Sequence, residues 1–93
     1  MVDPMTPETF SAHVGSVFDA DGVTLRLVEV RSLGHQPGAP RPHPFALDFT
    51  GPREPFLDQR IHRLRHGALG ELEIFLVPIG VDADGARYEA VFN

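Results

Sequence analysis

Apolar and polar residues alternate in short runs from residue 16 onward, and glycine, proline or aspartate separates the runs. In FALDFTG, for example, Phe45, Leu47 and Phe49 occupy every second position. A β-strand points successive side chains to opposite faces, so this period predicts strands with one buried face. The pattern excludes a mainly helical fold, which needs apolar residues three and four positions apart.

The tetrapeptide Asp-Ala-Asp-Gly occurs twice, at 19–22 and 82–85, each time between two apolar runs. Glycine supplies the positive φ of a tight turn, so both copies predict β-hairpins. A calcium loop of the EF-hand kind begins in the same way, but it needs glycine at its sixth position and an acid at its twelfth. The sixth positions here are Thr24 and Arg87, and neither twelfth position is acidic. We therefore expect turns and no calcium site.

The apolar positions change phase in the strand that follows the first turn. Leu25 and Leu27 share one parity, whereas Val28 and Val30 share the other. A β-bulge near Leu27-Val28 would restore a single buried face by inserting one residue. A strand buried on both faces at this point is the alternative.

Proline and glycine interrupt the strand pattern at two places. Residues 34–44 contain four prolines and two glycines, and GPREP occupies residues 51–55. Because proline has no backbone N–H to donate to a central sheet, we predict a loop at each place.

A short helix is predicted before the strands. Thr6 is placed as its N-cap, and Pro7 occupies the first helical position, where its fixed φ suits a helix. Phe10 and Val14 lie four residues apart, so both are expected to dock on the core. Gly15 is expected to end the helix.

These elements predict an all-β fold with one short N-terminal helix, namely an about six-stranded, mainly antiparallel small barrel or sandwich. A length of 93 residues fits one domain. We expect residues 1–5 to form a flexible N-terminus and residues 6–93 to form a single β domain. Within it, residues 34–44 form the Pro/Gly-rich loop.

The last run of the sequence, RYEAVFN, repeats the alternation, with Tyr88, Ala90 and Phe92 at one parity. We expect residues 87–92 to pair with residues 71–77. Phe92 would then belong to the core and tie the end of this strand into the sheet.

Charge and cysteine content exclude several function classes. The formal net charge is −5 and all eight cationic residues are arginine, which argues against binding to duplex DNA, because DNA-binding proteins usually present a basic face. Without cysteine, the chain has no disulfide, thiolate zinc site or thiol nucleophile. No apolar run approaches the roughly 18 residues of a membrane span, and from the pattern of the first residues we expect no signal peptide. We expect a cytoplasmic protein, alone or in a larger assembly, with no nucleic-acid or membrane partner.

The chain contains five histidines, a residue type that commonly binds metals. His62 and His66 lie four residues apart, which on a strand is about 13 Å and too far for one ion. His35 and His43 share the proline-rich loop, but no third ligand is evident. We expect no metal, and we expect His62 to be a core-rim residue with a hydrogen-bond partner.

Catalytic patterns are also absent from the sequence. Ser11, Ser16 and Ser32 lack the glycine context of a hydrolase nucleophile. Glu71 and Glu73 alternate with core leucines, which favours a solvated face over acid–base chemistry. We expect no cofactor and no enzymatic activity.

One apolar surface remains unexplained. On the strand at 71–80, Phe75, Val77 and Ile79 occupy the parity that should face solvent. The N-terminal helix would cover them, a partner or a second copy would cover them, or they are scattered exposed residues.

The stretch RIHRLRH at 60–66 is locally basic. As a strand it points Ile61, Arg63 and Arg65 one way, and we interpret it first as a solvated strand with arginines. It is also a second part of a candidate protein interface, whose residues are Phe75, Val77, Ile79, Arg60, Arg63 and Arg65.

The sequence resembles a family of short bacterial proteins classified only as a domain of unknown function. The segments that carry the resemblance are Phe10 with Val14-Gly15, LVEV at 27–30, ALGELEIFLVPIG at 68–80 and YEAVFN at 88–93. FLVPIG followed by RYEAVFN after an Asp-Gly turn is its most specific part. The resemblance implies a small β domain without assigned activity, cofactor or catalytic residue, and it is associated with phage-tail-like fibre and collar proteins.

The leading hypothesis is a non-catalytic protein-interaction or assembly module that binds a protein partner or a second copy of itself. The alternative is a small-molecule or glycan-binding β domain with residues 34–44 as its rim. An enzyme of unknown class ranks third.

Overall fold

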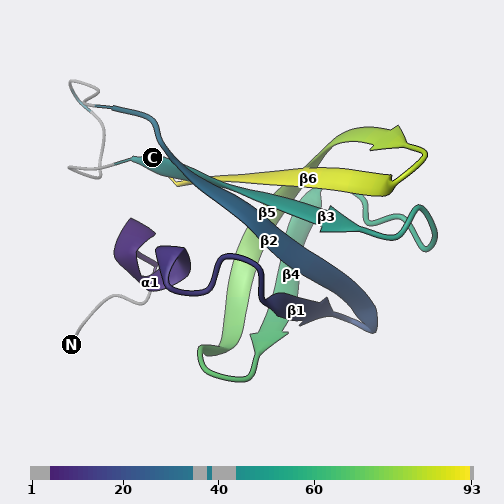
Figure 1. The fold of residues 1–93 in the computed structure, drawn as a ribbon, viewed down its shortest axis with the longest axis horizontal. Coiled ribbons are helices and arrows are strands. Elements are labelled where there is room, and N and C mark those ends of the chain that lie inside the picture. The colour runs from purple at the N-terminus through teal and green to yellow at the C-terminus, as the bar shows by residue number, and fades with distance from the viewer. Residues whose placement is uncertain (1–4, 35–37, 39–43, 93) are drawn as a thin grey trace.

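The computed structural model describes residues 5–34, 38 and 44–92, and it forms a closed antiparallel barrel with the strand order β1-β2-β3-β6-β5-β4 (Figure 1). This confirms the all-β class and selects a barrel over a sandwich. The elements are α1 (Pro7–Ser11), β1 (Val17–Ala20), β2 (Val23–Ser32), β3 (Phe45–Gly51), β4 (Arg60–His66), β5 (Gly70–Asp82) and β6 (Gly85–Phe92).

The period of two determines the core. In β3, Phe45, Leu47 and Phe49 are each at most 1% exposed, as their spacing predicts. Leu64 of β4 and Ile74 of β5 are buried in the same way. Burying a side chain of this size contributes roughly 1.5–3 kcal/mol, so alternation on all strands is sufficient to define one apolar interior.

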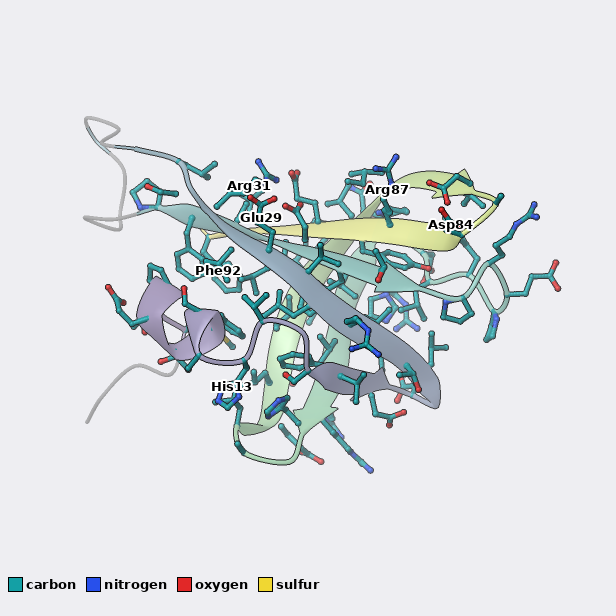
Figure 2. All side chains as sticks on the ribbon, viewed as in Figure 1. His13, Glu29, Arg31, Asp84, Arg87 and Phe92 are labelled. Atoms are coloured by element: carbon teal, nitrogen blue, oxygen red, sulfur yellow. The ribbon has the colours of Figure 1, made fainter. Side chains whose placement is uncertain are left out.

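Aromatic residues close the barrel at one end. Phe10 of α1 is fully buried, and its ring centroid lies 6.2 Å from that of Phe45 and 6.0 Å from that of Phe92. Figure 2 shows Phe92 beside the helix. In the middle of β6, the backbone N–H of Leu57 donates a hydrogen bond of 2.9 Å to the hydroxyl of Tyr88, which ties the segment between β3 and β4 to the barrel.

The helix begins as predicted and ends early. Thr6 is the N-cap, and its side chain accepts a hydrogen bond from the backbone of the first turn. The helix ends at Ser11, and Val14 is 48% exposed, so the prediction that Val14 docks on the core is wrong. The chain turns instead, with Gly15 at φ 92°, and the N–H of Gly15 donates to the carbonyl of Leu27 at 2.7 Å.

Two β-bulges interrupt the barrel. The register of β2 against β3 shifts between Leu27 and Glu29, so Val28 is bulged outward and 48% exposed. This confirms the predicted bulge over a strand buried on both faces. A second shift, in β5 against β6, centres on Ile79 beside Pro78 and was not predicted.

The predicted pairing of residues 87–92 with residues 71–77 is correct in its strands but wrong in register, because within those ranges only Val77 has its partner in β6. Only the second half of β5 pairs with β6, beginning with Val77 opposite Glu89, while residues 70–76 pair with β4. β5 is 13 residues long and therefore spans two neighbours in succession. Phe92 is nevertheless tied to the sheet, because β6 pairs with β3 along its whole length, and its side chain packs against the core.

The remaining predictions about segments fall largely outside the described residues. Of the proposed flexible N-terminus, Met5 is described, and it packs against the core. Most of the proline-rich loop at 34–44, including His35 and His43, is not described.

Candidate interaction surface

The outer surface of β4 and β5 joins exposed apolar side chains to a row of opposite charges. Alternation along β4 turns His62 and Leu64 into the barrel and the residues between and beside them outward. β5 does the same with Leu72, Ile74 and Leu76. The six outward residues, which we call the β4–β5 face, are Ile61, Arg63, Arg65, Glu71, Glu73 and Phe75.

Ile61 and Phe75 form the apolar part of this face. They are direct cross-strand partners, and they are 59% and 48% exposed. Ile79, further along β5, is 51% exposed. The helix α1 packs at the end of the barrel against Phe45 and Phe92 and leaves these side chains open, so the expectation that the helix covers them is wrong.

The charged part of the face is arranged in register. Arg63 lies opposite Glu73, and Arg65 lies opposite Glu71. The Nε atom of Arg65 is 3.2 Å from Oε1 of Glu71, with the two side chains 64% and 56% exposed. An ion pair this exposed contributes less than about 1 kcal/mol to stability, so this pair adds little to the fold.

The predicted interface residues separate into groups in the structure. Arg63, Arg65 and Phe75 are brought together on the β4–β5 face. Val77 is half-buried and lies opposite Glu89, at the edge of that face. The residue that the candidate set missed is Ile61, although the parity of RIHRLRH already places it beside the two arginines.

Arg60 lies outside the face. It has the parity of the buried residues of β4, and its cross-strand partner is the buried Leu76. Its Nε atom donates a 2.9 Å hydrogen bond to Oδ1 of Asp58, and this bond lowers the pKa of the Asp58 carboxyl. Arg60 therefore belongs to the rim of the barrel.

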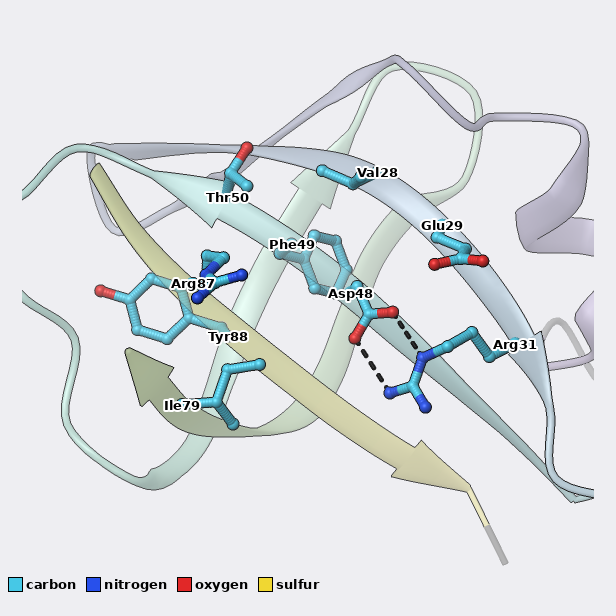
Figure 3. Close-up of a pocket in the computed structure, with 9 residues that line it drawn as sticks. All are labelled: Val28, Glu29, Arg31, Asp48, Phe49, Thr50, Ile79, Arg87 and Tyr88. Atoms are coloured by element: carbon cyan, nitrogen blue, oxygen red, sulfur yellow. Dashed lines mark hydrogen bonds and ion pairs between the residues drawn. The ribbon is translucent and has the colours of Figure 1, made fainter. Parts of the chain in front are cut away.

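A groove of about 350 Å³ lies on a different part of the outer surface, over β3 and β6. Figure 3 shows Val28 and Ile79, the two bulged residues, on opposite sides of it. The two bulges thus place apolar side chains at both rims of one depression. The groove is lined by Val28, Glu29, Arg31, Asp48, Phe49, Thr50, Ile79, Arg87 and Tyr88.

Arg31 occupies one end of the groove. Its guanidinium donates to both carboxylate oxygens of Asp48, at 2.6 and 3.0 Å, and also to Glu89. The hydrogen bonds that Arg31 donates to Asp48, first, and to Glu89, second, raise the pKa of Arg31 above its ordinary value. Because this cation is shared between two carboxylates on neighbouring strands, it links β2 to β3 and β6 at this end of the groove.

A serine and a histidine meet near the turn between β4 and β5, with Ser16 Oγ 2.9 Å from Nε2 of His66. Nδ1 of His66 accepts hydrogen bonds from the N–H groups of Ala68 and Leu69, so the ring proton is on Nε2 and points to Ser16. The Ser16 hydroxyl in turn donates to the carbonyl of His13 at 2.6 Å. A nucleophilic serine needs a neighbouring general base that accepts its proton. With its own proton on Nε2, His66 does not act as that base toward Ser16.

The ring of His13, labelled in Figure 2, has a neighbour in His66. The two ring centroids are 4.6 Å apart. Burial first, and the charge of His13 second, lower the pKa of His66. Sequence reasoning missed this pair because the two histidines are brought together only by barrel closure. No group of three metal-ligating side chains gathers anywhere in residues 5–34 and 44–92.

His62 is 1% exposed and has the hydrogen-bond partner expected of it, since Nε2 lies 2.8 Å from the carbonyl oxygen of Asp58. The carbonyl accepts only, so Nε2 carries the proton and Nδ1 is a bare acceptor. Within the described part of the chain Nδ1 has no hydrogen-bond partner. His62 and His66 therefore have separate environments on β4, one inside the barrel and one at its end.

Both Asp-Ala-Asp-Gly segments are hairpin turns, as predicted. Asp21 and Gly22 have φ of 52° and 89°, and Oδ1 of Asp19 accepts the N–H of Gly22 at 3.1 Å. In the second turn Oδ1 of Asp82 accepts the N–H of Asp84 at 2.9 Å. In each segment, one carboxylate oxygen of the first aspartate accepts a hydrogen bond within its own turn.

Comparisons with known proteins add one match. A family model described as a domain of unknown function (DUF6916) matches residues 5–92. No curated protein and no solved structure matches the chain. Across the described residues, no helix has the length and apolar content needed to cross a membrane.

Proposed function

Because the chain belongs to the family of the domain of unknown function DUF6916, whose description assigns no activity, we propose a function from the structure itself. We propose that the domain is a non-catalytic interaction module that docks a protein on its β4–β5 face. The cross-strand pair of Ile61 and Phe75 carries this proposal.

Exposed apolar residues are common singly, and a pair in register is the informative observation. Val17, for example, lies opposite Arg26, and Val91 lies opposite the buried Ala46. Among all strand pairings that the structure describes, only that of Ile61 with Phe75 joins two large apolar side chains that are both exposed.

The surroundings of this pair support the proposal. Directly opposed side chains lie about 4.5–5.5 Å apart at Cβ, so Ile61 and Phe75 form one continuous apolar area. Aromatic residues are enriched at the centres of protein interfaces and charged residues at their rims. Arg63 and Glu73, the next outward pair on the same strands, supply such a rim.

An assembly role is the setting that we propose for this module. The chain resembles short bacterial proteins associated with phage-tail-like fibre and collar proteins, and in such an assembly small domains act through surface contacts. Within this proposal the protein acts in the bacterial cytoplasm or in a larger particle.

Site-specific photo-crosslinking in cells tests the proposal. A photoreactive phenylalanine analogue is placed at Phe75 and, as the matched control, at Val17, which is equally exposed at 48%. We expect crosslinked protein adducts from position 75 and few from position 17. An absence of adducts at position 75, or equal yields at both positions, would refute docking on this face.

The groove between Val28 and Ile79 favours a second candidate, a site for a small ligand. Its volume of about 350 Å³ falls in the range of pockets that hold small molecules, roughly 300–1,000 Å³. Its two aromatic residues, Phe49 and Tyr88, are at most 1% exposed and offer no platform for a sugar ring, so a glycan is the weaker candidate. Screening of small molecules by amide chemical shifts tests this, with shifts at Val28, Thr50 and Ile79 expected.

A further inference from the structure

We propose that a second copy of this chain is a partner of the β4–β5 face, and that the two copies meet about a two-fold axis running between β4 and β5, parallel to the strands. This inference rests on the proposed function and names its partner. It is derived from the way in which charge and apolar surface are divided between the two strands.

The division between the strands is complete over three successive outward positions. β4 contributes Ile61 and then two arginines, while β5 contributes Phe75 and then two glutamates. Each arginine has a glutamate as its direct cross-strand partner, and Ile61 has Phe75. One strand is therefore entirely cationic in its charged part, and the other is entirely anionic.

A two-fold axis along the strands converts this register into contacts between copies. The rotation carries β4 of one copy over β5 of the second copy at the same height along the strands. Arg63 of one copy then faces Glu73 of the second copy, Arg65 faces Glu71, and Ile61 faces Phe75. Two-fold symmetry repeats each contact, so every outward residue of the face meets a complementary one.

The alternative face-to-face arrangement is electrostatically unfavourable. With the two-fold axis across the strands, β4 of one copy lies over β4 of the second copy, and β5 lies over β5. Arginines would then meet arginines and glutamates would meet glutamates, and such like-charge contacts suppress a binding mode. The charge pattern thus selects one relative orientation, which is how electrostatic complementarity acts in specific interfaces.

The barrel itself favours contact through a face. The six strands form a closed cycle in which β1 pairs with β4 at Asp19–Arg65 and Ala20–Leu64, so these positions are not open to a strand from another chain. In the proposed dimer a second copy packs its side chains against the outer surface, and the β4–β5 face supplies an apolar centre for this contact.

The expected dimer is weak and sensitive to salt. The described chain has a surface of 5644 Å², and a contact that covers about a tenth of each copy buries roughly 1,100 Å² in total, near the lower limit for specific interfaces. Exposed charge pairs at its rim are screened by added salt. We expect a monomer–dimer equilibrium that shifts with concentration between about 1 and 500 µM, measured by sedimentation equilibrium, with a lower dimer fraction in high salt.

Paired charge reversals provide the decisive test. Arg63→Glu alone and Glu73→Arg alone each place like charges across the axis. Each variant should therefore dimerise more weakly, with a dissociation constant raised at least about tenfold. An equimolar mixture of the two variants should regain the dimer, because each copy again faces an opposite charge in the other. The double variant Arg63→Glu/Glu73→Arg should also dimerise with itself.

Arg53→Glu is the matched control, because it makes the same change in charge at an exposed arginine outside the face, and it should leave the dimer unchanged. Melting temperatures of all variants establish that they are folded. Failure of the mixture to restore dimer, or equal loss in Arg53→Glu, overturns the proposed geometry.

The same measurements separate this inference from the proposed function. A native chain that stays monomeric at all concentrations overturns the dimer. If position 75 then still crosslinks to a different protein, the docking function stands and only the identity of the partner was wrong. If position 75 crosslinks to nothing, both proposals fail.

Discussion

The ring of Phe92 lies flat against the ring of Phe45, with centroids 4.6 Å apart and ring planes 4° apart. Phe10 of α1 approaches both rings, so these three side chains close one end of the barrel. Phe92→Ala removes one ring of this group of three. Because Phe92 is partly buried, we expect the free energy of unfolding to fall by about 2–3 kcal/mol, below the value for a fully buried phenylalanine.

Urea denaturation of Phe92→Ala beside Val91→Ala measures this. Val91 is the neighbour of Phe92 on β6 and is 45% exposed, so its truncation should cost less than about 0.5 kcal/mol. Equal losses in the two variants would show that the stacked rings do not hold the end of β6.

The hydroxyl of Tyr88 should contribute measurably to the free energy of unfolding. It accepts the N–H of Leu57 inside the structure, and in Tyr88→Phe that buried N–H loses its partner. Leaving a buried donor unpaired costs about 1–3 kcal/mol. We expect a loss of stability in that range, together with faster hydrogen exchange of the Leu57 amide. Unchanged exchange at Leu57 would contradict the hydrogen bond.

Gly85 should not tolerate a side chain. Its φ is 136°, and a Cβ atom placed there would lie 2.2 Å from the carbonyl oxygen of Gly51. Backbone strain and overpacking each cost about 1–3 kcal/mol, so Gly85→Ala should lower the melting temperature substantially. Gly67→Ala is the control, because Gly67 has open space around its Cβ position and should accept alanine. A similar melting temperature for both variants would be inconsistent with the close approach at Gly51.

Local sequence predicted much of the strand content because burial of alternate residues depends on neighbours along the chain. The inward row of β3, Phe45, Leu47 and Phe49, was readable in this way, as were the turn at Asp21-Gly22 and the bulge at Val28. Each of these features has its physical cause within a few residues.

The features that sequence reasoning missed depend on which strands meet. Closure of the barrel rests on two register pairs between β1 and β4, one of which joins Asp19 to Arg65. The bulge at Ile79 lies just beyond the point at which β5 leaves β4 and joins β6. Contacts of this kind, including that of Ser16 with His66, join residues far apart in sequence and have no local signal.

His66 should make the domain less stable in mild acid. Its pKa in the folded protein lies below the ordinary value of 6.5, mainly because the ring is partly buried. The unfolded chain therefore takes up the proton first. The stabilising contribution is complete above about pH 6.5 and is lost as the pH falls from there through the folded pKa.

His66→Asn tests this linkage, because the amide oxygen can still accept the N–H groups of Ala68 and Leu69 but does not titrate. We expect the free energy of unfolding of the native chain to fall more steeply between about pH 7 and 5 than that of His66→Asn. Parallel pH profiles for the two proteins would assign the acid sensitivity to other groups.

Phe75 and Ile74 are neighbours on β5, and one side chain is exposed while the other is buried. Substituting each in turn tests whether folding requires the apolar outer surface. Phe75 is 48% exposed, whereas Ile74 is 1% exposed. Phe75→Glu places its charge in solvent, so we expect the free energy of unfolding to change by less than about 1 kcal/mol. Ile74→Glu places a charge in the apolar interior and should unfold the domain, because a buried and unpaired carboxylate costs several kcal/mol. Circular dichroism melts of the two variants measure the difference.

If Phe75→Glu also unfolds, the side chain serves the fold of the single chain, and the exposed pair of Ile61 and Phe75 no longer supports docking. If it stays folded, the fold of the single chain does not require a phenylalanine at this position, and the exposed pair of Ile61 and Phe75 continues to support the docking proposal.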